Sequence, residues 1–325
     1  MRLRRRAVLA AAAAPLAARR PLRAQDAAWP PGRPIRLVVP FAAAGSSDAL
    51  GRFLAERLAR NLGQPVVVEN RPGMAGSIGV EHVARSAPDG TSFVIVTTNQ
   101  AINETLQPRR GFELLRDLTP VASVNALPLA LAVANAVPAR SVAELVAHAK
   151  ANPGRIDYGS SGPGSLYHLT AEEFCRRTGT RMQHIPFRNF NEGRTALVAG
   201  QIGAMFDAAF TLAPLIEAGQ VRGLATTGVR RPGLLPDLPL LSEAVPGMEV
   251  TLWNGLLGPA GLPRAMAERM NAEMNRILSD PATVEAQARL GAVVTPMTVD
   301  AFAEFLRREV AAQAEAVRVA GVQPE

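Results

Sequence analysis

Cysteine, lysine and aromatic residues are scarce in this chain of 325 residues, and the scarcity of cysteine excludes two kinds of structure. Cys175 is the only cysteine, so the chain can form neither an internal disulfide nor a thiolate metal cluster. Aromatic residues make up only 5% of the chain, and Lys150 is its only lysine. Because Cys175 stands within a predicted helix, we interpret it as a buried structural thiol.

Net charge is also missing once the N-terminus is set aside. The formal charge of +7 arises there, since residues 1–24 contain seven arginines and no acid. Beyond residue 24, 28 basic residues stand against 28 acidic ones. A neutral body has no electrostatic footprint for nucleic acid or for an anionic membrane, so we expect no nucleic-acid partner. Any anion that the chain binds must be recognised locally.

Residues 1–24 have the layout of an export signal. Arginines open the segment, residues 7–18 are apolar, and Leu22-Arg23-Ala24 offers a cleavage site. The apolar part is too short to span a bilayer. The Arg5-Arg6 pair favours the twin-arginine route, although the consensus is incomplete and the general route stays open. We therefore expect a periplasmic protein; the alternative, a basic arm for nucleic acid, leaves the alanine-rich part without a role.

Strand-like and helix-like segments alternate along the rest of the chain, which predicts an α/β fold with a mainly parallel sheet. A first block runs over residues 35–97, and a second begins after extended segments at 121–124 and 129–133. The last long helices, predicted at 263–278 and 300–319, lack the strands for a domain of their own. We expect them to pack on the first block, so that the chain crosses between two domains twice.

Three junctions between a strand and a helix carry small or hydroxyl residues where the helix begins. They are Phe41–Asp48, Tyr158–Ser165 and Phe187–Gly193. Helix starts present unpaired N–H groups and about half a positive charge, so they bind carboxylates without a lysine or an arginine. One such loop from each block, facing across a cleft, would bind the two ends of a dicarboxylate or an amino acid.

Each of these junctions also has a purely structural interpretation. Ser47, Ser165 and Asn191 are residue types that cap helices, and Gly45 fits an ordinary turn. Asp48 suits the helix dipole better than a ligand contact, because it would repel a carboxylate. The binding hypothesis therefore depends on two such loops in different blocks rather than on any single residue.

Catalytic and metal-binding patterns are absent from the sequence. The four histidines show no metal-ligand spacing with Asp, Glu or Cys, so we expect no metal and no cofactor. The chain has no Gly-x-Ser-x-Gly elbow, and Gly162-Pro163-Gly164 is neither a dinucleotide nor a phosphate loop. Ser165 and His168 share one side of a helix start, which leaves a hydrolase as an alternative. Since an orienting acid and an oxyanion hole are missing, we expect a protein that is not an enzyme and has no catalytic residue.

Short motifs follow one another in a fixed order from residue 29 to the C-terminus. They are Trp29-Pro30, Arg33–Phe41, Gly45–Asp48, Val68–Gly73, Pro88–Thr91, Ala149–Gly154, Gly164-Ser165 with His168-Leu169, Ile185–Arg188, Trp253–Leu256 and Pro259–Gly261. Together they resemble the Bug family, the TctC-like periplasmic solute-binding proteins of tripartite tricarboxylate transporters. Each motif alone is weak, whereas the ordered set is highly specific.

The resemblance implies a type II periplasmic-binding-protein fold, in which two α/β lobes joined by two hinge crossings close on a small carboxylate. Lobe 1 would comprise residues 25–127 and 255–325, and lobe 2 residues 128–254. A monomer would deliver a di- or tricarboxylate, an amino acid or an aromatic acid to the membrane subunits of the transporter. A ligand-sensing subunit for a membrane sensor kinase is the alternative.

The resemblance also implies ligand contacts from both lobes. In lobe 1 they are Phe41, Gly45, Ser46, Ser47 and Asp48, with Thr98 and Asn99 at the end of a neighbouring strand. In lobe 2 they are Ser160, Ser161, Gly164, Ser165, His168, Arg188 and Asp207. The chain departs from the family at Ala43-Ala44-Gly45, where a glycine is lost, and at Phe187-Arg188-Asn189, where a tyrosine and a glycine are replaced. Because both changes touch the expected pocket, the identity of the ligand does not follow from the resemblance.

Overall fold

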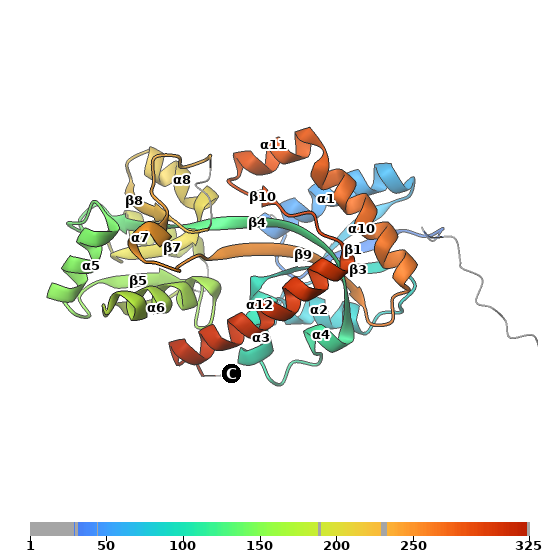
Figure 1. The fold of residues 1–325 in the computed structure, drawn as a ribbon, viewed down its shortest axis with the longest axis horizontal. Helices are drawn as coiled ribbons and strands as arrows, with labels where there is room; N and C mark the ends of the chain where they lie inside the picture. Colours follow the sequence, from blue (N-terminus) through green and yellow to red (C-terminus); the bar gives the residue numbers. More distant parts are fainter. Residues whose placement is uncertain (1–28, 30–31, 44, 188–189, 229–232, 324–325) are drawn as a thin grey trace, which may run out of the picture.

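The computed structural model describes residue 29 and residues 32–43, 45–187, 190–228 and 233–323. The expected export signal and Arg188 lie outside these residues. Within them, no helix combines the length and the apolarity that crossing a membrane requires. The chain forms two α/β halves side by side, and two long strands run from one half to the other (Figure 1).

The first half is built from the N-terminal part of the chain up to the first crossing strand. Its elements are β1 (Ile35–Val39), α1 (Ser46–Leu62), β2 (Val66–Asn70), the 3₁₀ turn η1 (Met74–Gly76), α2 (Ser77–Ala84), β3 (Ser92–Thr97), α3 (Thr98–Leu106) and α4 (Leu114–Asp117). The first crossing strand is β4 (Leu118–Ala134).

The second half follows, and the chain then returns to the first. The elements of the second half are α5 (Val142–Ala151), β5 (Asp157–Ser160), α6 (Leu166–Thr178), β6 (Gln183–Pro186), α7 (Phe190–Val198), β7 (Ala204–Ala208), α8 (Ala209–Glu217), β8 (Val221–Thr226) and α9 (Leu241–Ala244). The return comprises the second crossing strand β9 (Thr251–Pro259), α10 (Arg264–Ser279), α11 (Pro281–Arg289), β10 (Val293–Val294) and α12 (Val299–Ala320).

All described strands join one curled sheet in the order β2-β1-β3-β9-β4-β7-β5-β6, with β10 and β8 also paired to β4. Pairing is parallel between β1 and its neighbours β2 and β3, and between β5 and its neighbours β6 and β7. The pairs that involve β4 or β9 are antiparallel. The expected mainly parallel sheet is therefore wrong as a whole, because the two crossing strands run in opposite directions through its centre.

The two crossings are long, continuous strands rather than loops. The sequence predicted two extended segments at 121–124 and 129–133, and the structure joins them in the 17 residues of β4. This strand pairs with β9 as far as Pro128, and from Leu129 on it pairs with β7 and, one residue later, with β8. The change of partners falls between Pro128 and Leu129, one residue beyond the boundary predicted after residue 127. We propose it as the hinge between lobe 1 and lobe 2.

The C-terminal helix α12 contacts both lobes. In its first half, Phe302 and Leu306 are buried in the core of lobe 1. Near its end, Val317 is 2% exposed and belongs to a buried cluster that contains most of the lobe 2 core together with Ile102 and Leu106 of α3. Figure 1 shows α12 running diagonally beneath the crossing strands. The sequence placed this helix on the first block alone, so the prediction missed its second contact.

Candidate functional site

A cavity of about 730 Å³ lies where the two lobes and the two crossing strands meet. Lobe 1 supplies the loop after β1, the first turns of α1, the start of α3 and the end of α11, and lobe 2 supplies residues of α6, α7 and α8. The lining residues are Phe41, Ala42, Ala43, Gly45, Ser46, Ser47, Ala49, Leu50, Phe53, Thr97, Asn99, Asn125, Leu127, Tyr167, Asn191, Arg194, Ala208, Phe210, Thr211, Leu252, Asn254, Ala286, Gln287 and Leu290.

The start of α1 forms one wall of this cavity. Its first helical residue is Ser46, preceded by Gly45, which provides no side-chain cap for the helix. Ser47 is thus not the capping residue, and no hydroxyl of an N-cap residue occupies the N–H groups of the first turn. Five residues predicted from the sequence as ligand contacts line the cavity: Phe41, Gly45, Ser46, Ser47 and Asn99.

Asp48 supports this loop from behind rather than lining the cavity. It is buried, and its carboxylate accepts hydrogen bonds from Arg52 Nε at 3.0 Å and from Asn70 Nδ2 at 3.0 Å. Asn70 also donates to the carbonyl oxygen of Phe41 at 3.2 Å. The carboxylate in the first turn of α1 therefore tethers the loop between β1 and α1 to the edge strand β2.

Thr98 and Asn99 begin a helix that the sequence analysis did not predict. The hydroxyl of Thr97 accepts from the N–H of Asn99 at 3.2 Å, and Gln100 completes a capping box, so α3 starts directly at the end of β3. Thr98 is wholly buried, and its hydroxyl accepts from the N–H of Trp253 on β9 at 3.1 Å. It lies outside the cavity lining and ties α3 to the second crossing strand. A capping signal at Thr97 with glutamine three residues on was the missed clue.

The predicted contacts at the start of α6 lie outside the cavity lining: Ser160, Ser161, Gly164, Ser165 and His168. Ser165 caps α6 by accepting from the N–H of His168 at 3.3 Å, which is the structural alternative raised for it. His168 Nδ1 in turn accepts from the N–H of Gly164 at 2.9 Å. Among the described residues, no hydrogen bond joins the Ser165 hydroxyl to the ring of His168, and Nδ1 of His168 already accepts from Gly164, so the structure does not support a serine–histidine pair for hydrolysis. The expected ligand contacts of these five residues stay a prediction.

A stack of histidines lies beside this loop. The rings of His168 and His184 are 4.0 Å apart, and Tyr158 stacks on His184 at 5.1 Å. The Oγ atom of Ser160 lies 2.6 Å from Nε2 of His184. Burial lowers the pKa of His168, and burial together with the neighbouring His168 lowers the pKa of His184 to about 4. Both rings are therefore neutral at pH 7.

Asp207 holds the guanidinium group of Arg194 in the lobe 2 wall. Its side chain is completely buried and forms an ion pair with Arg194, which also donates to Asn191. Burial raises the pKa of Asp207, and the pair with Arg194 opposes this effect. Asp207 itself is outside the lining, whereas Arg194 and Asn191 are part of it. Asn191 lies within α7, so it does not cap that helix.

Three buried amides connect the hinge to α11. Asn254 on β9 donates to Oδ1 of Asn125 on β4 at 2.7 Å, and Asn125 donates to Oε1 of Gln287 at 2.6 Å. All three line the cavity. The sequence analysis missed them and the lobe 2 residues Tyr167, Phe210 and Thr211, because no local motif shows which side of a strand or helix faces a cleft. Of these residues, only Asn254 belongs to a motif that the sequence analysis singled out, Trp253–Leu256.

Comparison with known proteins identifies the family. The family described as "Tripartite tricarboxylate transporter family receptor", TctC, matches residues 50–321. BugT of Bordetella pertussis is 32% identical over 296 residues, which cover 90% of this chain and 91% of that protein. The chain belongs to the TctC family. The resemblance found in the sequence is thereby confirmed, and with it membership of a family of periplasmic solute receptors.

Solved structures of similar proteins share this fold. Rpa4515 of R. palustris, solved with adipate, superposes with a TM-score of 0.82 at 31% identity, covering 91% of this chain and all of that one. MatC of Rhodopseudomonas palustris, solved with bound malate, gives a TM-score of 0.77 at 27% identity, covering 88% and 99%. The structure described as periplasmic binding protein BugD gives a TM-score of 0.79 at 30% identity, covering 91% of this chain and all of that one. The expected periplasmic-binding-protein fold is thereby confirmed, and two similar proteins are described with carboxylate ligands.

Proposed function

We propose that this TctC receptor binds a small carboxylate in the cavity between its lobes and delivers it to the membrane subunits of a tripartite transporter. The observation that carries the proposal is the cavity of about 730 Å³ with the start of α1 in its wall. Adipate and malate in two related structures support a carboxylate as the ligand.

The start of α1 has the chemistry that a carboxylate needs. Backbone N–H groups at a helix start are fixed donors, and the helix dipole adds about half a positive charge. Gly45 and Ser46 are exposed at this point, and Ser46 and Ser47 add hydroxyl donors. Asn99, from the neighbouring α3, adds a side-chain amide. These donors are pre-positioned, so binding costs little reorganisation.

The arrangement of the two lobes around the cavity would also allow them to close on the ligand. The two lobes share β4 and β9, whose partner change near Pro128 is the proposed hinge. A ligand that contacts both walls binds the closed form better than the open form, and it therefore shifts the population toward closure. The closed monomer is the form that the transporter would recognise in the periplasm. No bond is made or broken in this scheme, which is that of a receptor and not of an enzyme.

The test uses thermal unfolding of the protein without residues 1–24, refolded to remove any bound ligand. Mono-, di- and tricarboxylates and amino acids are added in turn. A ligand at about a hundred times its Kd contributes roughly 2.7 kcal/mol, which shifts the unfolding midpoint by several degrees. We expect at least one carboxylate to raise the midpoint and to be recovered unchanged. No shift by any carboxylate, or conversion of the one that binds, would contradict the proposal.

A further inference from the structure

The walls of the cavity narrow the class of acid, an inference that rests on the proposed carboxylate function. We infer that the receptor takes a monocarboxylic acid with an apolar body, either an aryl or an alkyl group, in preference to a dicarboxylate. Two observations support this inference. Apolar side chains line the cavity on both lobes, and Arg194, the only charged residue among the described lining residues, is already paired with Asp207.

The apolar wall begins beside the α1 start and continues on the facing lobe. Leu50 and Phe53 are three residues apart on α1, so they share one helix face within two turns of Ser46, and Phe41 joins them from the preceding loop. Tyr167 and Phe210 line the opposite side. These side chains, apolar except for the hydroxyl of Tyr167, are half-buried and keep part of their surface open. A ligand that covered this surface would gain the free energy of removing it from water.

The charge in the lobe 2 wall is balanced before any ligand arrives. Among the described residues that line the cavity, Arg194 is the only one with a charged side chain. It is paired with the fully buried Asp207, and it lies over the ring of Phe190 at 5.4 Å. A second ligand carboxylate would have to compete with Asp207 for this guanidinium. Burying a carboxylate that has neither a free cation nor a set of free N–H donors is unfavourable.

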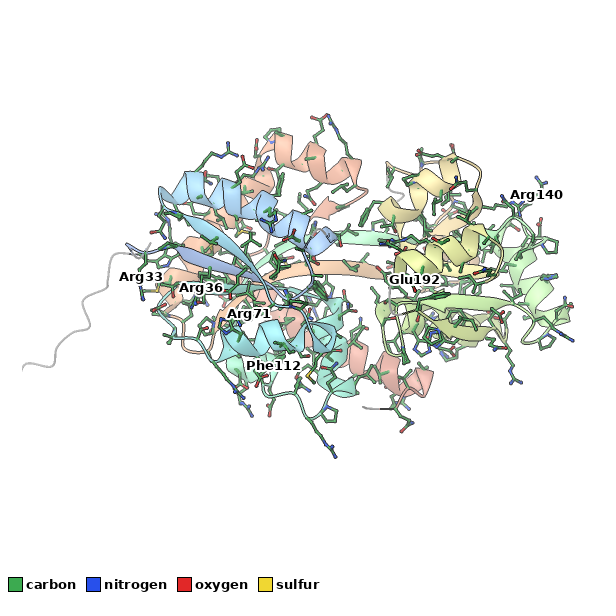
Figure 2. The ribbon with its side chains drawn as sticks, turned by 180° about the vertical axis from the view of Figure 1, so that it is seen from behind. Arg33, Arg36, Arg71, Phe112, Arg140 and Glu192 are labelled. Carbon is green, nitrogen blue, oxygen red and sulfur yellow. The ribbon has the colours of Figure 1, made fainter. Side chains whose placement is uncertain are left out.

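Polar groups of the protein itself also lie at two helix starts in lobe 2. The N–H of Ala208, just before α8, donates to Oδ1 of Asp207 at 2.7 Å, so a negative charge already lies beside this helix start. The start of α6 is capped by Ser165. Glu192 is exposed on α7 beside Asn191, and Figure 2 shows it toward the part of lobe 2 that borders lobe 1. Glu192 is not part of the cavity lining, so solvent screens the repulsion between its charge and an anionic ligand group.

Matched pairs of acids that differ in one carboxylate test the inference by isothermal titration calorimetry. The pairs are hexanoate with adipate, and benzoate with terephthalate, each titrated into the refolded protein without residues 1–24. We expect the monoacid to bind at least tenfold more tightly in one pair or both. Tighter binding of the diacid in both pairs overturns this inference and leaves the proposed receptor function standing. If no acid of the wider thermal-unfolding panel binds, the proposed function fails as well.

Substitutions in the wall test the same point on the protein. Leu50→Asn and Phe210→Asn place an amide where an apolar ligand body would lie, one in each lobe. The control is Leu115→Asn on α4, an exposed leucine outside the lining. We expect the two wall variants to bind the preferred monoacid about tenfold more weakly, and the control to bind it like the native chain. Unchanged affinity in both wall variants, with unfolding midpoints showing that they fold, would contradict the inference.

Discussion

Ser46 is the first residue of α1, and at this position the backbone N–H and the side chain can be separated by mutation. Proline is tolerated at the first helical position but lacks the N–H, whereas alanine keeps the N–H and loses only the hydroxyl. We expect Ser46→Pro to weaken carboxylate binding about tenfold and Ser46→Ala to weaken it much less, as measured by calorimetry. Equal losses would assign the contact to the hydroxyl instead of the helix start.

The ion pair between Arg194 and Asp207 leads to a prediction about stability. Arg194→Met leaves a fully buried carboxylate without its cation, which costs about 3 kcal/mol of unfolding free energy at pH 7. The loss should shrink at pH 5, because an unpaired buried carboxyl takes up a proton. Urea unfolding measures both values. The double variant Arg194→Met with Asp207→Asn removes the charge and should be more stable than Arg194→Met alone at pH 7; the reverse order would contradict this reading of the pair.

The stacked histidines predict how stability changes with pH. The pKa of His184 is about 4 in the folded chain, below its ordinary value of 6.5, because of burial and of His168. The unfolded chain therefore takes up a proton first, and stability that is present above pH 6.5 is lost as the pH falls toward 4. Urea unfolding at pH 7 and pH 5 should show a smaller loss in His184→Gln than in the native chain. A loss of the same size in both would show that other groups cause it.

At the scale of elements, local patterns in the sequence predicted the helices well. Helices α1 and α10 were predicted from a leucine stripe and a methionine stripe, and their observed bounds lie within a residue or two of the predicted ones. Helix α3 was missed because it follows β3 without a loop. The continuity of β4 was missed because it depends on pairing with β9, more than a hundred residues away along the chain. Pairing at that distance leaves no periodic signal in either segment.

For the candidate site, too, the sequence indicated the residues of a local loop but not those that depend on packing between distant segments. Residues of the loop before α1 line the cavity. The sequence could indicate this position, because loops at the carboxyl ends of strands border the ligand crevice in α/β sheets. In lobe 2 the lining comes from Tyr167, one turn into α6, rather than from the glycine-rich loop before it. Which side of α6 faces the cleft depends on how the helix packs on β5 and β7, and the sequence alone does not contain that information.

Helix α12 contacts both lobes, and Val317 is its one buried residue in the cluster that contains most of the lobe 2 core. Val317→Asp places an unpaired charge in that core, and we expect it to lower the unfolding free energy by about 3 kcal/mol. Ala312→Asp, at an exposed position of the same helix, serves as the matched control and should change stability by less than about 0.5 kcal/mol. Similar values for the two variants in urea unfolding would show that the end of α12 does not stabilise lobe 2.

At the scale of the whole molecule, the fold places the cavity where three parts meet. Lobe 1 supplies the helix start, lobe 2 supplies a neutral aromatic wall, and the crossing strands supply Asn125 and Asn254. The amide chain from Asn254 through Asn125 to Gln287 joins both crossing strands to α11, so a ligand that contacts it would act directly on the hinge. In the proposed function, these buried hydrogen bonds would link ligand binding to closure.

The most direct measurement is a crystal structure of the protein with the acid that gives the largest rise in unfolding midpoint. The account predicts a carboxylate within hydrogen-bond distance of the N–H groups at the start of α1, with the rest of the acid between Phe53 and Phe210. An acid bound outside this cavity, or in the cavity with its carboxylate turned away from α1, would contradict it.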